Sequence, residues 1–162
     1  MVSTCSRPLL ASGTSILVVL LYSVMLGPET MPRRKRSRIV RRILVVEDEP
    51  HIRDFLVEFL TACGHRVESA GNGSEALTLL TERSFALILT DLQMPEMDGE
   101  ALYQKIAQTW PHLASRVVFL TSGVPSSALD VFSGGARVPI LRKPFNPETL
   151  QQLVERMLNQ ES

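Results

Sequence analysis

Acidic side chains follow directly on two short apolar runs of this chain. Glu47 and Asp48 come after the run Ile43–Val46, and Asp91 comes two residues after the run Phe85–Leu89. Carboxylates that meet at one place repel one another, and a bound cation relieves that repulsion. Ligands that are all oxygen favour Mg²⁺ over zinc. These residues therefore predict a magnesium site, provided that the fold brings the runs together.

Two later apolar runs end in side chains that suit phosphate chemistry. Thr121 follows the run Val117–Leu120, and Lys143 comes two residues after Val138–Leu141. An aspartate can attack phosphorus and form an aspartyl phosphate, and this transfer depends on positioning and on charge neutralisation. A cation, a lysine amine and a hydroxyl would supply both. The residue types thus predict phosphoryl transfer onto Asp91.

The elements that must position these residues alternate along the chain. We expect strands over 43–46, 66–70, 85–89, 117–120 and 138–141. Helical patterns begin near Pro50, Asn72, Asp98, Pro125 and Asn146, and the weak fourth one runs from Pro125 to Phe132. Five β/α units in about 120 residues predict a parallel sheet with helices on both faces, in which all strands end at one edge. Pro139 cannot donate to a ladder, so the last strand is expected at the side of the sheet.

Each candidate residue also has a purely structural interpretation. Glu47 and Asp48 could favour the amino end of the next helix, Thr121 could be a turn residue and Lys143 could be a solvated charge. Asp91 could cap a turn. That all five stand at the carboxyl ends of strands favours a site, because ligands bind at this edge of open α/β sheets.

Four segments resemble the receiver domain of two-component response regulators, the CheY-like family. They are LVVEDEP, LTDLQMPEMDG, VVFLTSG and LRKPF, and the resemblance covers about residues 43–160. It implies a flavodoxin-like three-layer α/β sandwich, with a five-stranded parallel sheet of order 2-1-3-4-5 and five helices.

The resemblance also implies roles for the acidic residues. Asp91 matches the phosphoacceptor, and Glu47 and Asp48 match the acid pair that holds Mg²⁺ together with Asp91. The backbone carbonyl of Gln93 would be a further metal ligand. Glu47 departs from the family pattern, since aspartate is commoner at that position, although its longer side chain still reaches the metal directly or through water.

The same resemblance assigns the hydroxyl and the ammonium. Thr121 matches the switch hydroxyl that closes onto the phosphoryl group, and Lys143 matches the lysine that pairs with it. The Lys143–Pro144 peptide bond would be cis. Three residues before the lysine, Ile140 replaces an aromatic residue that in many relatives reports phosphorylation, so a different way of signalling is expected here.

The function expected from this resemblance is that of a signalling domain and not of an enzyme. It would take a phosphoryl group from a histidine kinase or a histidine phosphotransfer protein and signal to a downstream protein by conformational change. We expect a receiver without an output domain of its own, or one detached from a hybrid sensor kinase. The alternative is a Mg²⁺-dependent phosphatase with an aspartyl nucleophile, but Glu47-Asp48-Glu49 lacks the Asp-x-Asp of such enzymes.

The first 42 residues differ in composition from the rest. They carry a net charge of +7, and the remainder carries −7. Residues 1–30 are an apolar segment, interpreted either as a membrane anchor or as a gene-model artefact with translation beginning at Met31. Residues 31–42 are interpreted as a basic linker. Residues 9–42 could contact a membrane, and no nucleic acid is expected to bind the receiver.

The cysteines and histidines point to no further site. Cys5 and Cys63 are interpreted as free thiols, which suits a reducing compartment. The three histidines, His51, His65 and His112, are interpreted as surface residues. We expect the receiver to lie in the cytoplasm, with an inner-membrane anchor as the other permitted arrangement.

Overall fold

The computed structural model describes residues 40–123 and 138–159. Within them the strands are β1 (Arg42–Val46), β2 (Arg66–Ala70), β3 (Leu87–Asp91), β4 (Val117–Thr121) and β5 (Ile140–Arg142). They form one sheet of order β2-β1-β3-β4-β5, and every neighbouring pair is parallel. The expected sheet and its strand order are confirmed.

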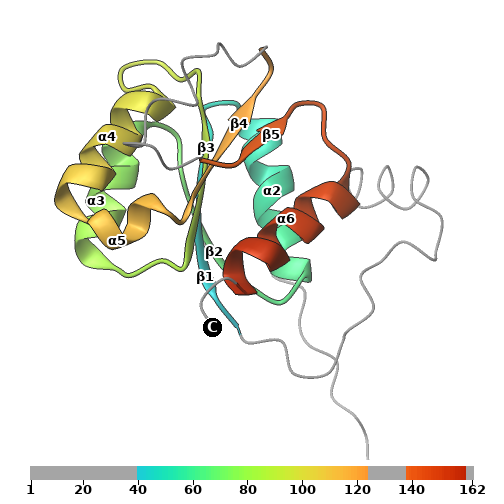
Figure 1. The fold of residues 1–162 in the computed structure, drawn as a ribbon. Coiled ribbons are helices and arrows are strands. Elements are labelled where there is room, and N and C mark those ends of the chain that lie inside the picture. Colours follow the sequence, from blue (N-terminus) through green and yellow to red (C-terminus); the bar gives the residue numbers. More distant parts are fainter. Residues whose placement is uncertain (1–39, 124–137, 160–162) are drawn as a thin grey trace, which may run out of the picture. The chain divides into compact units, whose positions relative to one another are not determined.

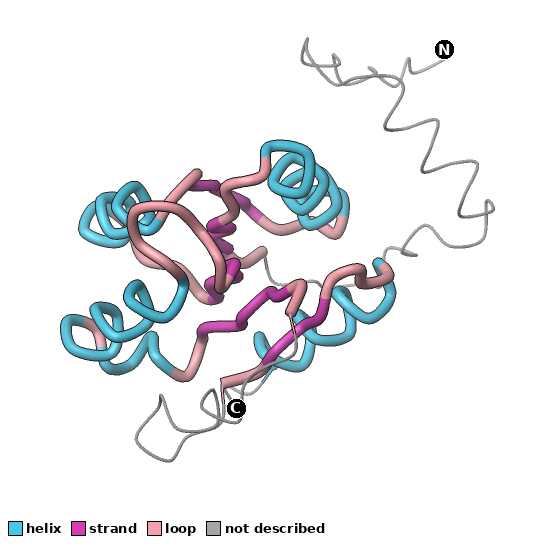
Figure 2. Tube along the Cα trace, turned by 90° about the horizontal axis from the view of Figure 1, so that it is seen from above, coloured by secondary structure: helices cyan, strands magenta, loops and turns pink. Residues whose placement is uncertain are grey.

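The helices of the described residues cover both faces of this sheet. They are α2 (Pro50–Ala62), α3 (Gly73–Glu82), α4 (Gly99–Thr109), α5 (Pro111–Ala114) and α6 (Pro147–Asn159). Figure 1 shows α2 and α6 on one face and α3, α4 and α5 on the other. Figure 2 shows the strands enclosed between these helices. The layers are those of the flavodoxin-like sandwich.

The burial of the strands follows their place in the sheet. Every residue of β3 and β4 is buried, whereas β2 and β5, at the two sides of the sheet, contain exposed residues. A strand covered by helices on both faces needs apolar side chains in both directions. This explains why the central strands are continuous apolar runs instead of alternating ones.

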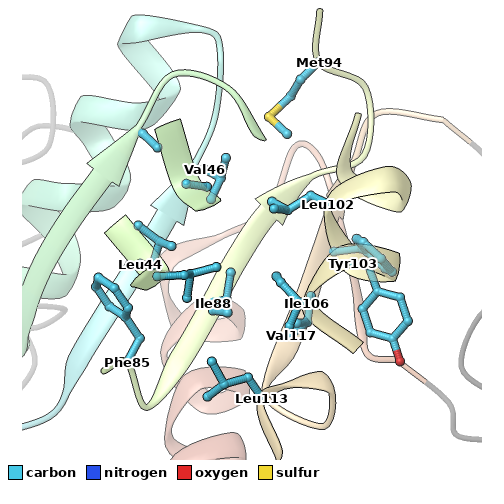
Figure 3. Packing of buried hydrophobic residues seen from close by; sticks show 14 residues of the cluster. Leu44, Val46, Phe85, Ile88, Met94, Leu102, Tyr103, Ile106, Leu113 and Val117 are labelled. Carbon is cyan, nitrogen blue, oxygen red and sulfur yellow. The ribbon is translucent and has the colours of Figure 1, made fainter. Parts of the chain in front are cut away.

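The core between the sheet and the helices α3, α4 and α5 consists of interlocking aliphatic and aromatic side chains (Figure 3). Leu44 and Ile88 contribute from the sheet, and Leu102 and Ile106 contribute from α4; none of these four side chains is exposed to solvent. At about 25 cal/mol per Å² of buried apolar surface, such packing is the main source of stability. The core fixes β1 and β3 side by side and thereby fixes the residues at their ends.

The predicted helix starts are confirmed at three caps. The side chains of Asn72, Asp98 and Asn146 accept hydrogen bonds from main-chain amides three residues later, at 2.9, 2.7 and 2.7 Å. These bonds satisfy amides that a helix leaves unpaired at its amino end. By contrast Glu49, the N-cap of α2, makes no side-chain capping bond.

Some predicted boundaries were wrong. The third strand begins at Leu87 and not at Phe85, and it ends with Asp91, which confirms the expected place of this residue at the carboxyl end of a central strand. Pro139 precedes β5, and its carbonyl oxygen accepts a hydrogen bond from the Phe119 amide at 2.9 Å. The fifth strand does lie at the side of the sheet. The short helix α5 was not predicted, and the helix predicted over Pro125–Phe132 lies outside the described residues.

The prediction for His65 was also wrong. Its side chain is buried, with 7% exposure, where the turn after α2 leads into β2. His51 and His112 are exposed as expected, and Cys63 is buried and forms no disulfide within the described residues. In the described part of the chain no helix is long and apolar enough to cross a membrane. The expected anchor and basic linker lie mostly before residue 40, outside the described residues.

Candidate functional site

The predicted residues meet at the carboxyl edge of the sheet. Asp91 and Thr121 are the last residues of β3 and β4. Glu47 directly follows β1, and Lys143 directly follows β5. The parallel register places these strand ends level, with Asp91 opposite Leu120 on the neighbouring strand. The fold thus collects at one edge side chains that lie up to 96 positions apart in the sequence.

Three carboxylates form a cluster there. Ligand oxygens of Glu47, Asp48 and Asp91 all lie within 4.8 Å of one another. Glu47 and Asp91 are buried, with 0% and 6% exposure, and Asp48 is more exposed than either. Negative charges this close in a poorly solvated place cost several kcal/mol, roughly, unless cations neutralise them.

Lys143 supplies one such cation. Its Nζ donates to Glu47 Oε2 at 2.7 Å and to Asp91 Oδ2 at 2.5 Å, and its side chain is only 10% exposed. The amine therefore bridges two carboxylates that come from different strands. The peptide bond between Lys143 and Pro144 is cis, as the resemblance implied.

The charges of this cluster change the acidity of its members. Burial raises the pKa of Glu47 to about 7; the hydrogen bond from Lys143 opposes this rise and the nearby charge of Asp91 adds to it. Burial alone would lower the pKa of Lys143, but its bonds to Asp91 and Glu47 outweigh burial and raise that pKa. The lysine is therefore protonated. Its hydrogen bond to Glu47 does not fully offset the cost of burying the ionised Glu47 carboxylate.

The donor set fits a divalent cation. Glu47 Oε1 is buried and has no hydrogen-bond partner, although the other oxygen of the same carboxylate bonds Lys143. A buried carboxylate oxygen without a donor is costly, and a metal ion beside Asp48 and Asp91 would satisfy it. Oxygen ligands alone are the set expected for Mg²⁺ and not for zinc.

Main-chain and hydroxyl groups orient the remaining parts. The Gln93 amide donates to Asp91 Oδ1 at 3.0 Å, so the two oxygens of Asp91 have different partners. The buried Thr121 hydroxyl oxygen accepts from the Gly123 amide at 3.1 Å. The acceptor role of this hydroxyl oxygen leaves its proton available for donation. Metal ligation by the Gln93 carbonyl stays a prediction.

Comparison with known proteins agrees with this arrangement. The family model described as the response regulator receiver domain matches residues 43–155. The chain belongs to this family. Receivers are signalling domains of phosphorelays, which fits a strand-end aspartate surrounded by acids and a lysine. The family also accounts for the flavodoxin-like fold.

Individual receivers give the same picture. The chain is 38% identical over 120 residues to the response regulator receiver protein CpdR of Brucella abortus, an alignment covering 74% of this chain and 98% of CpdR. It is 33% identical over 118 residues to the response regulator Rre1 of Synechocystis, covering 72% of this chain and 51% of Rre1. The chain thus spans the whole of one relative and about half of the other.

A solved structure agrees with the fold. The chemotaxis protein CheY4 of Vibrio cholerae superposes with a TM-score of 0.68 at 28% identity, and the match covers 74% of this chain and 100% of CheY4.

The segment that follows Asp91 is held tightly within the receiver. The Gly99 amide donates to the Leu92 carbonyl at 3.0 Å, which closes the loop between β3 and α4. A Cβ atom at Gly99 would lie 2.2 Å from the Asp91 carbonyl oxygen, so only glycine fits here. Within the loop Glu96 has a φ of 65°, a conformation that non-glycine residues rarely adopt. From the sequence, the pair Asp98-Gly99 indicates only a turn or a helix cap.

Sequence reasoning missed Arg53 altogether. Its Nη1 donates to the main-chain oxygens of Glu47 and Asp48, at 2.7 and 3.3 Å. The one hint in the sequence is a basic residue in the first turn of a helix, where the helix dipole disfavours positive charge.

Proposed function

We propose that Asp91 is the phosphoacceptor of this receiver and takes its phosphoryl group from a histidine kinase or a histidine phosphotransfer protein. The observation that carries the proposal is the environment of the Asp91 carboxylate. One oxygen accepts from Lys143 and the other from the Gln93 amide, and the acid pair Glu47 and Asp48 lies within 4.8 Å. Such an aspartate is oriented at both oxygens and lies next to the acidic cluster proposed to bind the cation.

In the proposed reaction a carboxylate oxygen of Asp91 forms a bond to phosphorus. The nitrogen–phosphorus bond of the donor phosphohistidine breaks, and its electron pair stays on the imidazole. The Lys143 ammonium would give up its bond to Asp91 and pair with the oxygens of the transferred phosphoryl group, to which it lies close enough. The Thr121 proton would be donated to the same group, because the hydroxyl oxygen already accepts from Gly123. These contacts match the charge that develops in phosphoryl transfer.

Glu47, Asp48 and Asp91 would hold Mg²⁺, and the Gln93 carbonyl would be a further ligand. When bound, the cation neutralises negative charge on the phosphoryl oxygens. The unpartnered Oε1 of Glu47 supports this assignment. The same groups would assist the later hydrolysis of the aspartyl phosphate, so the domain would contribute to its own dephosphorylation without acting on other substrates.

We propose that the signal leaves through docking of a downstream protein. Ile140, the first residue of β5, is half-buried and stands where many receivers have an aromatic residue. An aliphatic side chain has no ring to turn inward, so the response here would depend on Thr121 and on the segment after β4.

The proposed organisation of the chain keeps the receiver, residues 43–160, in the cytoplasm, where kinases obtain ATP. Residues 31–42 would be a basic linker. Residues 1–30 would either anchor the chain in the inner membrane or be absent from the translated protein. Both arrangements leave the phosphorylation site on the cytoplasmic side.

The test is labelling by a small phosphodonor in the presence of Mg²⁺, followed by intact-protein mass measurement. The wild type should gain one phosphoryl group that is stable in acid and labile in base, and Asp91→Asn should gain none. Asp98→Asn is the matched control, because Asp98 is an exposed aspartate of the same loop and asparagine caps a helix equally well. Labelling of Asp91→Asn at the wild-type level would disprove the assignment. Steady turnover of a phosphate ester would favour a phosphatase instead.

A further inference from the structure

Arg53 lies in the first turn of α2 and points back to the loop that carries the acid pair. Its Nη1 donates to the main-chain oxygen of Glu47 at 2.7 Å and to that of Asp48 at 3.3 Å. Both bonds go to main-chain oxygens of the two residues whose side chains enter the carboxylate cluster. At this end of a helix the dipole disfavours a cation, so the position of Arg53 needs another reason.

Few other contacts within the described residues accompany those that Arg53 makes to this loop. Glu49, the N-cap of α2, contributes no side-chain capping bond. The Glu47 amide bonds the Ala70 carbonyl at 3.1 Å, which fixes the start of the loop to β2. Arg53 then fixes the two carbonyls that follow. Its guanidinium lies beside the turn after β2, since a Cβ atom on Gly71 would be 3.5 Å from Nη1.

We propose that Arg53 is a positioning residue that orders the β1–α2 loop so that the side chains of Glu47 and Asp48 meet Asp91. The inference rests on the proposed function of the carboxylate cluster as a Mg²⁺ site. Partners that orient metal ligands from outside the ligand set commonly change metal affinity by about 10-fold or more. Arg53 orients the ligands through their main chain.

The sign of the effect separates positioning from simple charge. Removing a positive charge close to a cation site strengthens cation binding by Coulomb's law. Removing a group that orders the ligands weakens it, because the ligands must then be ordered when the metal binds. A loss of Mg²⁺ affinity on removal of Arg53 is therefore opposite to what its charge alone would produce.

The experiment is calorimetric titration of the full chain with Mg²⁺ alone. Arg53→Met keeps most of the side-chain length but removes the charge and the donors, and Arg53→Lys keeps the charge with a different donor geometry. We expect the dissociation constant to rise about 10-fold in Arg53→Met and by less in Arg53→Lys. Arg66→Met is the matched control, because Arg66 is exposed at the amino end of β2, and its affinity should equal that of the wild type. Wild-type or tighter binding by Arg53→Met would overturn the proposal.

Hydrogen–deuterium exchange without metal gives an independent readout. Amides of residues 47–49 should exchange faster in Arg53→Met than in the wild type, and unchanged exchange would overturn the proposal even if no Mg²⁺ bound. Should Arg53→Met fail to fold, Arg53→Lys decides, since wild-type affinity and exchange in that variant would refute positioning by the guanidinium. Absence of Mg²⁺ binding by the wild type would instead refute the proposed metal site.

Discussion

Two loops of the receiver deliver carboxylates to the same place, and they are held in different ways. The loop between β1 and α2 carries Glu47 and Asp48; a main-chain bond from the Glu47 amide to Ala70 holds its start, and the side chain of Arg53 holds the two carbonyls that follow. The loop between β3 and α4 follows Asp91 and is fixed by its own main chain. Its amides at Gln93, Met97 and Gly99 all donate to acceptors within residues 91–95.

The difference shows what each loop can tolerate. Replacing Arg53 removes two hydrogen bonds from the β1–α2 loop but introduces no steric clash, so this loop can become less ordered while the domain stays folded. A loop packed as closely as Gly99 against the Asp91 carbonyl leaves no room for any side chain. We therefore expect Asp91 to tolerate less change in its surroundings than Glu47 and Asp48 do.

Gly99→Ala should have the largest effect. Its Cβ would lie 2.2 Å from the Asp91 carbonyl oxygen and 3.0 Å from the Leu92 Cα, so main chain has to move. Such overpacking costs about 1–3 kcal/mol of unfolding free energy, and it displaces the main chain of Asp91 as well. Denaturant unfolding and phosphodonor labelling should both show the loss.

Gly71→Ala is the matched control for that change. A Cβ at Gly71 would make only ordinary contacts, at 3.5 Å from Arg53 and Glu75. We expect its unfolding free energy to stay within about 0.5 kcal/mol of the wild type. Equal behaviour of the two variants would show that the β3–α4 loop is not held by close packing.

The acid pair should respond to pH. Because burial raises the pKa of Glu47 to about 7, the folded chain keeps a proton that the unfolded chain releases near its ordinary value of 4.5. Without metal, the contribution of Glu47 to stability is fully present below pH 4.5 and is lost as the pH rises to about 7. Metal binding requires the ionised form, so Mg²⁺ affinity should be about tenfold lower at pH 6 than at pH 8.

Melting temperatures of the metal-free wild type and of Glu47→Gln between pH 4 and 8 isolate this effect. The difference between the two proteins should change in that window, because the amide does not titrate. A difference that is constant with pH would show that Glu47 ionises normally.

The smallest expected effects concern Glu49 and Asp98, the N-cap residues at which the two loops lead into α2 and α4. Asp98→Ala removes the 2.7 Å bond to the Ala101 amide and should cost about 1 kcal/mol. Glu49→Ala removes no capping bond and should leave the unfolding free energy within about 0.5 kcal/mol of the wild type. Chemical denaturation of both variants measures the difference, and an equal loss in both would contradict the contrast between the loops.

The sequence predicted the parallel sheet and the meeting of five residues at its carboxyl edge, because both follow from local patterns and parallel connection, whereas the strand order followed from the resemblance to receiver domains. Apolar runs identify strands, but they do not show where a strand begins, because buried apolar residues next to a strand extend the same run. Phe85 is buried and precedes β3, which is why the predicted strand began two residues early. Pro111 begins α5, although a proline is as readily found just after a helix as at the start of one.

Other features depend on contacts that no local pattern contains. His65 is buried by residues brought over it by the fold, and a single polar residue after a glycine gives no sign of this. Arg53 bonds main-chain oxygens, which carry no residue type that a sequence could reveal. The unpartnered oxygen of Glu47 is likewise a property of the assembled site. The side chains that meet at the site could be predicted from the sequence, but the main-chain hydrogen bonds that hold them in place could not.

The hydrogen bonds of Lys143 to Glu47 and Asp91 can form only late in the synthesis of the chain. The lysine amine bonds Glu47 across 96 positions and Asp91 across 52, so a growing chain holds both acids long before the lysine exists. Contacts this distant along the chain form only after the segments between them are made and closed. The bridge is completed only when β5, a three-residue strand with a single neighbour, has docked against β4. The site proposed for phosphorylation is thus complete only when the domain has finished folding, and a nascent chain that still lacks Lys143 has no ammonium between Glu47 and Asp91.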